Sequence, residues 1–143
     1  MIDKSTTEGH MVRPLPRAEG PTAPYWQALR RREFLLPYDA DQGRFLHPIE
    51  SLSGASPDWR PAPREGRIES YSWVHLPTEG YEQVPYVLAT VALDNGPQLM
   101  CNILDAHSND VQIGARVSLV FEERADGWVV PQFTTTSRKE HAS

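Results

Sequence analysis

Short apolar runs alternate with polar turns through the second half of the chain. Each run has the length of a β-strand and is rich in Val, Ile, Leu and aromatic residues; the runs are 66–75, 84–93, 98–104, 113–122 and 128–133. A longer polar connection, 105–111, precedes the fourth run. Five short strands with this spacing predict a mainly β protein whose body is a five-stranded Greek-key barrel of the OB type. An SH3-like barrel and an open sandwich are the alternatives that the pattern leaves open.

The turn between the second and third runs is the clearest local signal. Asp94-Asn95-Gly96 predicts a hairpin that pairs Tyr86–Leu93 with Gln98–Leu104, because Asn-Gly tolerates a positive φ at both turn positions. Tyr86–Leu93 is almost continuously apolar, so we expect both of its faces to be largely covered. In the fourth run we expect every second side chain to point inward; these are Val117, Leu119 and Phe121.

A short helix is predicted before the barrel, from Thr22 to Phe34. Thr22 can cap its start, and Pro24 falls in the first turn. A helix of this length is marginal alone and must dock on another element. Tyr25 and Trp26 either anchor the helix to the barrel, which we favour, or contribute to a surface for a partner.

The chain therefore divides into four predicted segments. Residues 1–20 are polar and rich in proline, and we expect them to be flexible. The helix and a hairpin-like region occupy 21–64, the barrel occupies 65–134, and the polar residues 135–143 form a flexible end.

Composition and charge narrow the functional classes. Thirteen prolines in 143 residues argue against a helical bundle. The net charge is -5, and it is unevenly distributed: residues 1–64 hold nine Lys and Arg against eight Asp and Glu, whereas residues 65–143 hold five against eleven. An acidic barrel is a poor partner for nucleic acid, whose binding depends on neutralising phosphates.

The single cysteine, Cys101, excludes an internal disulfide and a cysteine-based zinc site. In its apolar strand it is most simply a buried small side chain. Residues 1–10 lack the apolar core of a signal peptide, and no run approaches the roughly 20 apolar residues of a membrane span. We therefore expect a cytoplasmic protein.

No catalytic constellation is visible in the sequence. There is no nucleophile-elbow serine, phosphate loop or zinc-binding His-Glu-x-x-His motif. Asp39, Asp41 and Gln42 do not complete a calcium loop. The histidines of interest, His47, His75 and His107, are single residues in unrelated segments. We predict no catalytic residue, no metal site and no catalytic activity of the chain alone.

From Tyr25 to about Phe133 the chain resembles the zinc-ribbon/OB-fold proteins that accompany thiolases and related acyl-CoA enzymes. The resemblance is carried by the order and spacing of short motifs across most of the chain. They are Tyr25-Trp26, Leu35-Leu36, Gly43, Pro48, Trp59, Gly66-x-Ile68-x-Ser70, Pro85-Tyr86-Val87-Leu88-Ala89-x-Val91-x-Leu93-Asp94-x-Gly96-Pro97, and Ile113-Gly114-x-x-Val117-x-Leu119-x-Phe121.

The chain departs from this family in its rubredoxin-like zinc ribbon. The family carries two Cys-x-x-Cys pairs there, whereas this chain has Asp39 and Gln42 at the first pair and Leu52 and Ala55 at the second. The resemblance therefore implies a degenerate ribbon hairpin without zinc. Packing must hold its arms together, and the side chains available are Phe34, Leu36, Tyr38, Phe45, Leu46 and Trp59.

The resemblance implies a non-catalytic acyl-CoA-associated subunit. Such a subunit binds and supports a thiolase-like, aldolase or enoyl-CoA hydratase partner in lipid, steroid or polyketide metabolism, with no cofactor of its own and a coenzyme A thioester as candidate ligand. A homodimer is also compatible with it. The alternative is a single-stranded nucleic-acid-binding OB module: Tyr71 and Trp73 fit stacking, but Glu69, Glu79 and Glu82 oppose it.

Two sets of candidate binding residues follow. Arg60 and Arg64, in a stiff proline-rich stretch, are candidates for the phosphates of coenzyme A, although solvation of that stretch is the plainer role. The aromatic residues before the barrel exceed what a monomer leaves in water, so we expect part of this set to form the partner surface. The candidates are Tyr25, Trp26, Arg30, Phe34, Tyr38 and Phe45.

Overall fold

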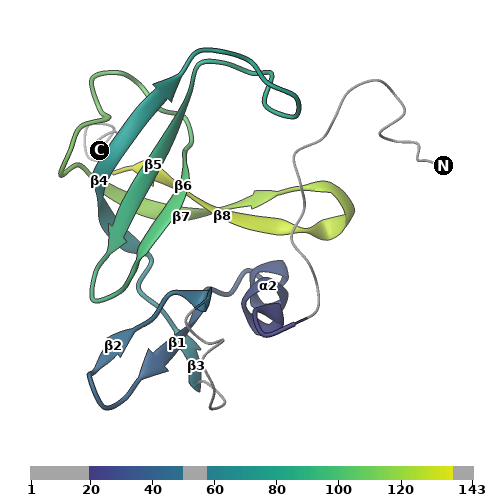
Figure 1. The fold of residues 1–143 in the computed structure, drawn as a ribbon, viewed down its shortest axis with the longest axis vertical. Helices are drawn as coiled ribbons and strands as arrows, with labels where there is room; N and C mark the ends of the chain where they lie inside the picture. Colours follow the sequence, from purple (N-terminus) through teal and green to yellow (C-terminus); the bar gives the residue numbers. More distant parts are fainter. Residues whose placement is uncertain (1–19, 50–57, 137–143) are drawn as a thin grey trace.

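The computed structural model describes residues 20–49 and 58–136 (Figure 1). The expected flexible ends, apart from Gly20 at one and Thr135 and Thr136 at the other, lie outside the described residues. So do Leu52 and Ala55, two of the four positions at which the resemblance predicts that ribbon cysteines are lost.

A closed five-stranded barrel forms the body of the molecule and confirms the predicted fold class. Its strands follow one another around the barrel in the order β4-β5-β6-β8-β7. They are β4 (Glu65–Val74), β5 (Tyr86–Leu93), β6 (Gln98–Ile103), β7 (Arg116–Glu123) and β8 (Val129–Thr135). A short 3-10 turn, η2 (Ala125–Gly127), joins the last two. All neighbouring strands pair antiparallel except β6 and β8.

The hairpin of β5 and β6 forms as predicted, but its turn differs from the expected geometry. Asn95 has a φ of 51°, whereas Gly96 stays outside the left-handed region. The backbone N–H of Gly96 donates to Leu93 O (3.2 Å) and that of Leu93 to Pro97 O (3.1 Å). These bonds close a turn with one left-handed residue rather than two.

A salt bridge joins this turn to β7. The Asp94 carboxylate accepts two hydrogen bonds from the Arg116 guanidinium, at 3.0 and 2.7 Å. These bonds lower the pKa of Asp94. Both side chains are nearly half exposed, so the pair orients the turn more than it stabilises the fold.

Two strands depart from simple alternation. A register shift between Ile68 and Ser70 interrupts the pairing of β4 with β5, and beyond it Ser70 and Ser72 are exposed. In β5 the expectation that both faces are covered is wrong. One face is buried in the barrel, but Leu88 on the other face is 39% exposed.

In β7, Val117 is buried, and Leu119 and Phe121 are partly buried against the core.

A small three-stranded sheet precedes the barrel, with strand order β2-β1-β3. Its strands are β1 (Leu35–Asp39), β2 (Arg44–Phe45) and β3 (Asp58–Pro61). The paired residues Tyr38 and Phe45 meet edge to face, with ring centroids 4.8 Å apart. The Asp39 carboxylate accepts hydrogen bonds from the backbone N–H groups of Asp41 and Gln42, at 3.0 and 3.3 Å. A carboxylate therefore organises the turn between β1 and β2.

The helix α2 (Ala23–Arg30) is shorter than predicted. Its end is set by backbone bonds from Arg32 N–H to Leu29 O and from Glu33 N–H to Ala28 O, with Arg32 at a φ of 64°. This is the Schellman ending, in which the chain turns through one left-handed residue. The expected cap is wrong in detail, because the Thr22 side chain makes no capping hydrogen bond.

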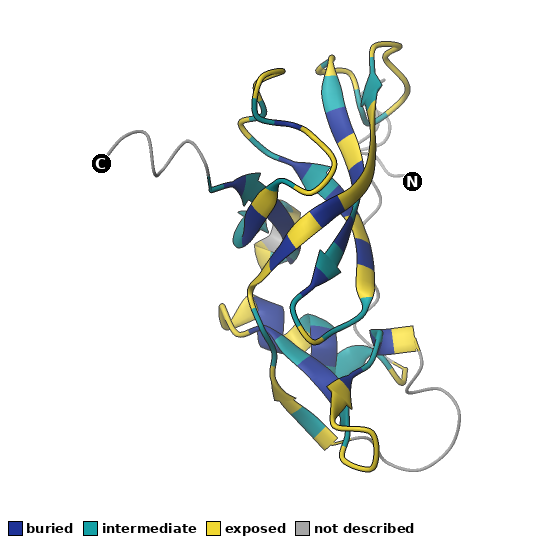
Figure 2. Ribbon diagram, turned by 90° about the vertical axis from the view of Figure 1, so that its left-hand side faces the viewer, coloured by how far each residue is buried: buried dark blue, intermediate teal, exposed yellow. Residues whose placement is uncertain are grey.

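One hydrophobic core joins the helix, the small sheet and the barrel (Figure 2). Leu29 of α2 and Leu36 of β1 are essentially inaccessible to solvent, and so is Phe34, which lies just before β1. The same holds for Val91 and Phe133 of the barrel. The segment before the barrel is therefore packed onto it and does not form a separate unit.

We predict that Gly66→Ala destabilises the barrel by about 1–3 kcal/mol. A Cβ at this position would lie 2.2 Å from the backbone oxygen of Ala92 on β5, so the paired strands would have to separate. Urea unfolding measures the change, and Ser70→Ala at an exposed site on the same strand is the control. Equal unfolding midpoints for the two variants would contradict the close approach.

Candidate functional site

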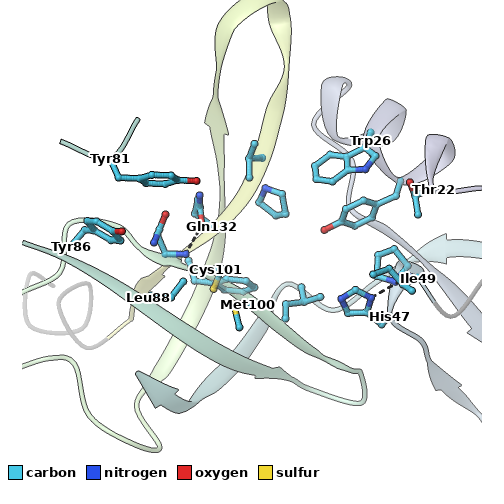
Figure 3. Close-up of a pocket in the computed structure, with 17 residues that line it drawn as sticks. Thr22, Trp26, His47, Ile49, Tyr81, Tyr86, Leu88, Met100, Cys101 and Gln132 are labelled. Atoms are coloured by element: carbon cyan, nitrogen blue, oxygen red, sulfur yellow. Dashed lines mark hydrogen bonds between the residues drawn. The ribbon is translucent and has the colours of Figure 1, made fainter. Parts of the chain in front are cut away.

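A cavity of about 650 Å³ lies between the helix, the segment 47–49 and the barrel (Figure 3). Residues of α2 form one wall, and the outer face of β5 and β6 forms another. The start of β8 and two tyrosines, Tyr81 and Tyr86, complete it. A volume of this size is in the range of pockets for small molecules.

The helix wall is fixed by aromatic packing. Tyr25 is buried beneath the helix, and its ring meets that of Trp26 edge to face with centroids 4.8 Å apart. Trp26 is only partly buried and borders the cavity. At the other end of α2, the Arg30 guanidinium stacks over the Trp128 ring at 4.8 Å. The helix is thereby held against the β7–β8 hairpin.

The barrel wall is apolar and exposed. Among the described residues, six large hydrophobic side chains are exposed, and three of them line this cavity: Ile49, Leu88 and Met100. Met100 is 73% exposed. Exposed apolar side chains scattered singly need no explanation, but three that line one hollow make it a candidate binding surface.

Gln132 occupies the junction between β6 and β8. Its Oε1 accepts the backbone N–H of Asn102 at 2.6 Å, and its Nε2 donates to Glu122 Oε1 at 2.9 Å. The Asn102 amide group in turn donates to Val87 O at 3.0 Å. Figure 3 shows Gln132 between Cys101 and Tyr81 at the cavity wall. A side chain thus replaces a missing backbone contact at this point of the barrel.

The cavity is lined by uncharged groups. None of its lining residues is Lys, Arg, Asp or Glu. Burial raises the pKa of the Cys101 thiol to about 12, and burial together with Cys101 raises the pKa of Tyr25. Both groups are neutral near pH 7. The cavity therefore suits an apolar, uncharged occupant and offers no cation for a phosphate.

The structure divides the six predicted partner-binding residues into two groups. Tyr25, Phe34 and Phe45 are buried in the common core. Trp26 and Tyr38 are partly buried, and Arg30 is exposed. The buried residues hold the segment against the barrel. Only Trp26, Arg30 and Tyr38 of the predicted set remain accessible to a partner. Their contact with a partner stays a prediction.

The two arginines predicted to meet coenzyme A lie away from the cavity and are engaged locally. Arg60 donates to the Asp58 carboxylate at 2.7 Å and stacks over the Tyr38 ring at 4.3 Å. Arg64 donates to the backbone oxygen of Arg32 at 3.4 Å and stacks over Phe121 at 5.1 Å. Both remain exposed, so their phosphate-binding role stays a prediction.

The histidines are not assembled into a catalytic or metal site. His47 borders the cavity and accepts the backbone N–H of Ile49 at its Nδ1, at 3.1 Å. His75 and His107 are exposed in other segments. In the described part of the chain, no three His, Cys, Asp or Glu side chains are grouped as metal ligands. The absence of bound zinc stays a prediction.

Sequence reasoning missed the barrel wall of the cavity. Leu88 and Met100 occupy the outward phase of their strands, and an apolar residue in that phase is the signal that could have found them. The continuous apolar run instead predicts coverage of both faces of β5, which the exposure of Leu88 contradicts. Gln132 carried no distinguishing pattern, because its role depends on where β8 meets β6.

Comparisons with known proteins agree with the barrel. Residues 59–122 match the family model described as the C-terminal OB-fold domain of ChsH2. A DUF35 domain-containing scaffold protein of Methanothermobacter thermautotrophicus is 38% identical over 68 residues, which are 44% of this chain and 51% of that protein. A probable enoyl-CoA hydratase alpha subunit of Thermomonospora curvata is 25% identical over 135 residues, 92% of this chain and 42% of the relative. The chain thus spans about half the length of the curated relatives it matches.

A solved structure shares the fold. A chain of the Ltp2-ChsH2(DUF35) aldolase superimposes with a TM-score of 0.69 at 23% identity, over 85% of this chain and 98% of that chain. At this identity the likeness establishes the fold. Among residues 20–49 and 58–136, no helix has the length and apolar character needed to span a bilayer.

We predict that Cys101 reacts slowly with thiol reagents in the native protein. At pH 8 a thiol with the ordinary pKa of 9.0 is about one-tenth thiolate, whereas a pKa of about 12 leaves about one molecule in ten thousand. Modification by a disulfide reagent should be at least about 100-fold slower than in guanidinium-unfolded protein, where the single thiol reacts fully. Similar rates in the two states would show that the cavity wall opens readily.

Proposed function

We propose that this chain is a non-catalytic OB-fold accessory subunit that binds and supports an enzyme of acyl-CoA metabolism. The similarity to DUF35 scaffold proteins and to a hydratase alpha subunit supports this role, as does the fold shared with a chain of an aldolase complex. Thiolase-like, aldolase and enoyl-CoA hydratase enzymes are the proposed classes of partner, in lipid, steroid or polyketide metabolism. In this proposal the partner carries the chemistry.

The observation that carries the proposal is a pair of exposed arginine–aromatic stacks before and beside the barrel. Arg30 lies over Trp128, and Arg60 lies over Tyr38. Arg, Tyr and Trp supply most of the binding energy at protein interfaces. Each stack also pre-orders a long arginine side chain, which reduces the conformational entropy that a contact would otherwise cost.

The proposed partner surface combines the exposed side of α2 with the small sheet. The buried residues Tyr25 and Phe34 fix this surface to the barrel through the common core. Because zinc is not expected here, packing in the common core would hold the small sheet in place, as a bound metal does in a complete zinc ribbon. A homodimer through the same surface is the other assembly that these contacts would permit.

We predict that Arg30→Ala and Tyr38→Ala weaken binding to the partner enzyme by about 2 kcal/mol or more each. The partner is first identified by purifying the tagged full-length chain from its native host and sequencing what co-purifies. Affinity is then measured with the purified enzyme. Leu76→Ala and Ile113→Ala, at exposed apolar sites away from the stacks, are controls. No co-purifying acyl-CoA enzyme would contradict the proposed function.

The proposal of direct coenzyme A contact has its own test. Replacing Arg60 and Arg64 together by alanine should lower the affinity of the subunit–enzyme complex for a coenzyme A thioester at least about tenfold, because two guanidinium groups would no longer reach phosphate. Calorimetry with acetyl-CoA measures the change. Unchanged affinity would show that the two arginines do not bind the phosphates of coenzyme A. Their role would then be to stack on Tyr38 and Phe121.

A further inference from the structure

Aromatic side chains stand on two different sides of the cavity. Trp26 of α2 lies on one side, and Tyr81 and Tyr86 lie on the other (Figure 3). The two tyrosine rings have their centroids 5.9 Å apart and are tilted by 31° to one another. Aromatic rings on separate walls provide large apolar surfaces with a defined geometry, which suit a molecule that itself contains rings.

The sheet wall of the cavity combines two apolar side chains with one amide. Leu88 of β5 is paired with Asn102 of β6, and Met100 precedes Asn102 by two residues. Side chains two residues apart on a strand, and those of paired residues, lie on the same face of a sheet. The Asn102 side chain therefore lies on the outer face together with the exposed Leu88 and Met100, and all three line the cavity.

The amide of Asn102 provides this wall with a hydrogen-bond acceptor. Its Nδ2 donates to Val87 O at 3.0 Å, and this bond fixes the orientation of the amide because a carbonyl oxygen can only accept. Among the described residues, none donates a hydrogen bond to Asn102 Oδ1. An uncharged acceptor therefore remains available on an otherwise apolar wall.

The charge and size of the cavity restrict what can fill it. A carboxylate, phosphate or ammonium group would lose its hydration there without meeting an opposite charge, because no lining residue is charged. The volume of about 650 Å³ is in the range that encloses most of the surface of a small organic molecule. A mainly apolar wall with a few polar groups that fix the orientation of the ligand is typical of such sites.

We propose that this cavity binds one uncharged, largely apolar small molecule that donates a hydrogen bond to Asn102 Oδ1. Cyclic alcohols, phenols and arylamines belong to this chemical class. The apolar rings would contact Trp26 and the Leu88–Met100 wall, and the single O–H or N–H group would face the amide. The inference concerns the chain itself and does not rest on the proposed function.

Three probes of one shape test the chemistry of the site in the full-length protein. N-phenyl-1-naphthylamine is uncharged and has one N–H, 8-anilinonaphthalene-1-sulfonate adds a sulfonate, and 1-phenoxynaphthalene replaces the N–H by an ether oxygen. Fluorescence titration measures the first two, and displacement of the first measures the third. We expect one molecule of the uncharged amine per chain. The sulfonate should bind at least about tenfold more weakly because it carries charge, and the ether about threefold more weakly because it cannot donate.

NMR of the methyl groups locates the bound probe without any substitution. N-phenyl-1-naphthylamine should shift the methyl signals of Met100 and Leu88 and leave those of Ile113, an exposed side chain outside the cavity, unchanged. Leu88→Asp places a carboxylate on the wall and should weaken binding of this probe at least about tenfold. Ile113→Asp is the matched control and should bind it as the unaltered chain does. Thermal unfolding of both variants shows that the barrel remains folded.

Three results would overturn the proposal. The first is equal affinity for the uncharged amine and the sulfonate, and the second is equal affinity for the amine and the ether. The third is probe binding that leaves the Met100 and Leu88 methyl signals unchanged. If no probe binds and Leu88→Asp also loses the enzyme that co-purifies with the unaltered chain, the cavity belongs to the interface with that enzyme. That outcome contradicts the small-molecule site and leaves the proposed function standing.

Discussion

The single parallel contact between β6 and β8 is the constraint on which the rest of the structure depends. A five-stranded barrel needs this junction to close, yet only Ile103 and Phe133 pair there. Side chains complete the closure: the Gln132 amide takes the Asn102 N–H, and the Phe133 ring fills the core. The remaining gap is covered from outside by the helix, whose Tyr25 lies buried near Cys101. The segment before the barrel is therefore part of how the barrel is sealed.

The small sheet is held together by side-chain packing and by hydrogen bonds within its turn. In a metal site, four sulfur ligands hold the two arms together and organise the turns between them. Here the Asp39 carboxylate organises the turn by accepting two backbone N–H groups, and the Tyr38 and Phe45 rings hold the arms. Phe34 and Leu36 anchor the sheet in the core shared with the barrel. Burial of these side chains stabilises the sheet against the barrel.

The sequence was sufficient for the features that depend on local pattern. Strand-length apolar runs, the Asn-Gly turn and the longer connection before β7 identified the five strands of the barrel and the β5–β6 hairpin. The features that failed depend on contacts distant in sequence. The register shift after Ile68 depends on how β4 pairs with β5. The alternation of apolar and polar residues along β4 does not predict it. The exposure of Leu88 follows from the cavity that separates this side of β5 from the helix, which a run of apolar residues cannot reveal.

The candidate site was predicted in part for the same reason. The aromatic residues before the barrel were identified by type, but type alone could not divide those that seal the barrel from those that remain accessible. The division is physical: Tyr25 and Phe34 face the core, whereas Trp26 borders the cavity and Arg30 stacks on Trp128.

The charge distribution separates two kinds of recognition on this small molecule. The cavity holds no charged lining residue, while Arg60 and Arg64 lie outside it, stacked on aromatic rings. A phosphate placed in the cavity would lose its water without gaining a cation, which is strongly unfavourable. An apolar chain placed at the arginines would gain little buried area. Desolvation alone therefore makes the cavity more favourable for apolar groups than for phosphates, whereas the two arginines lie where an anion would keep its water.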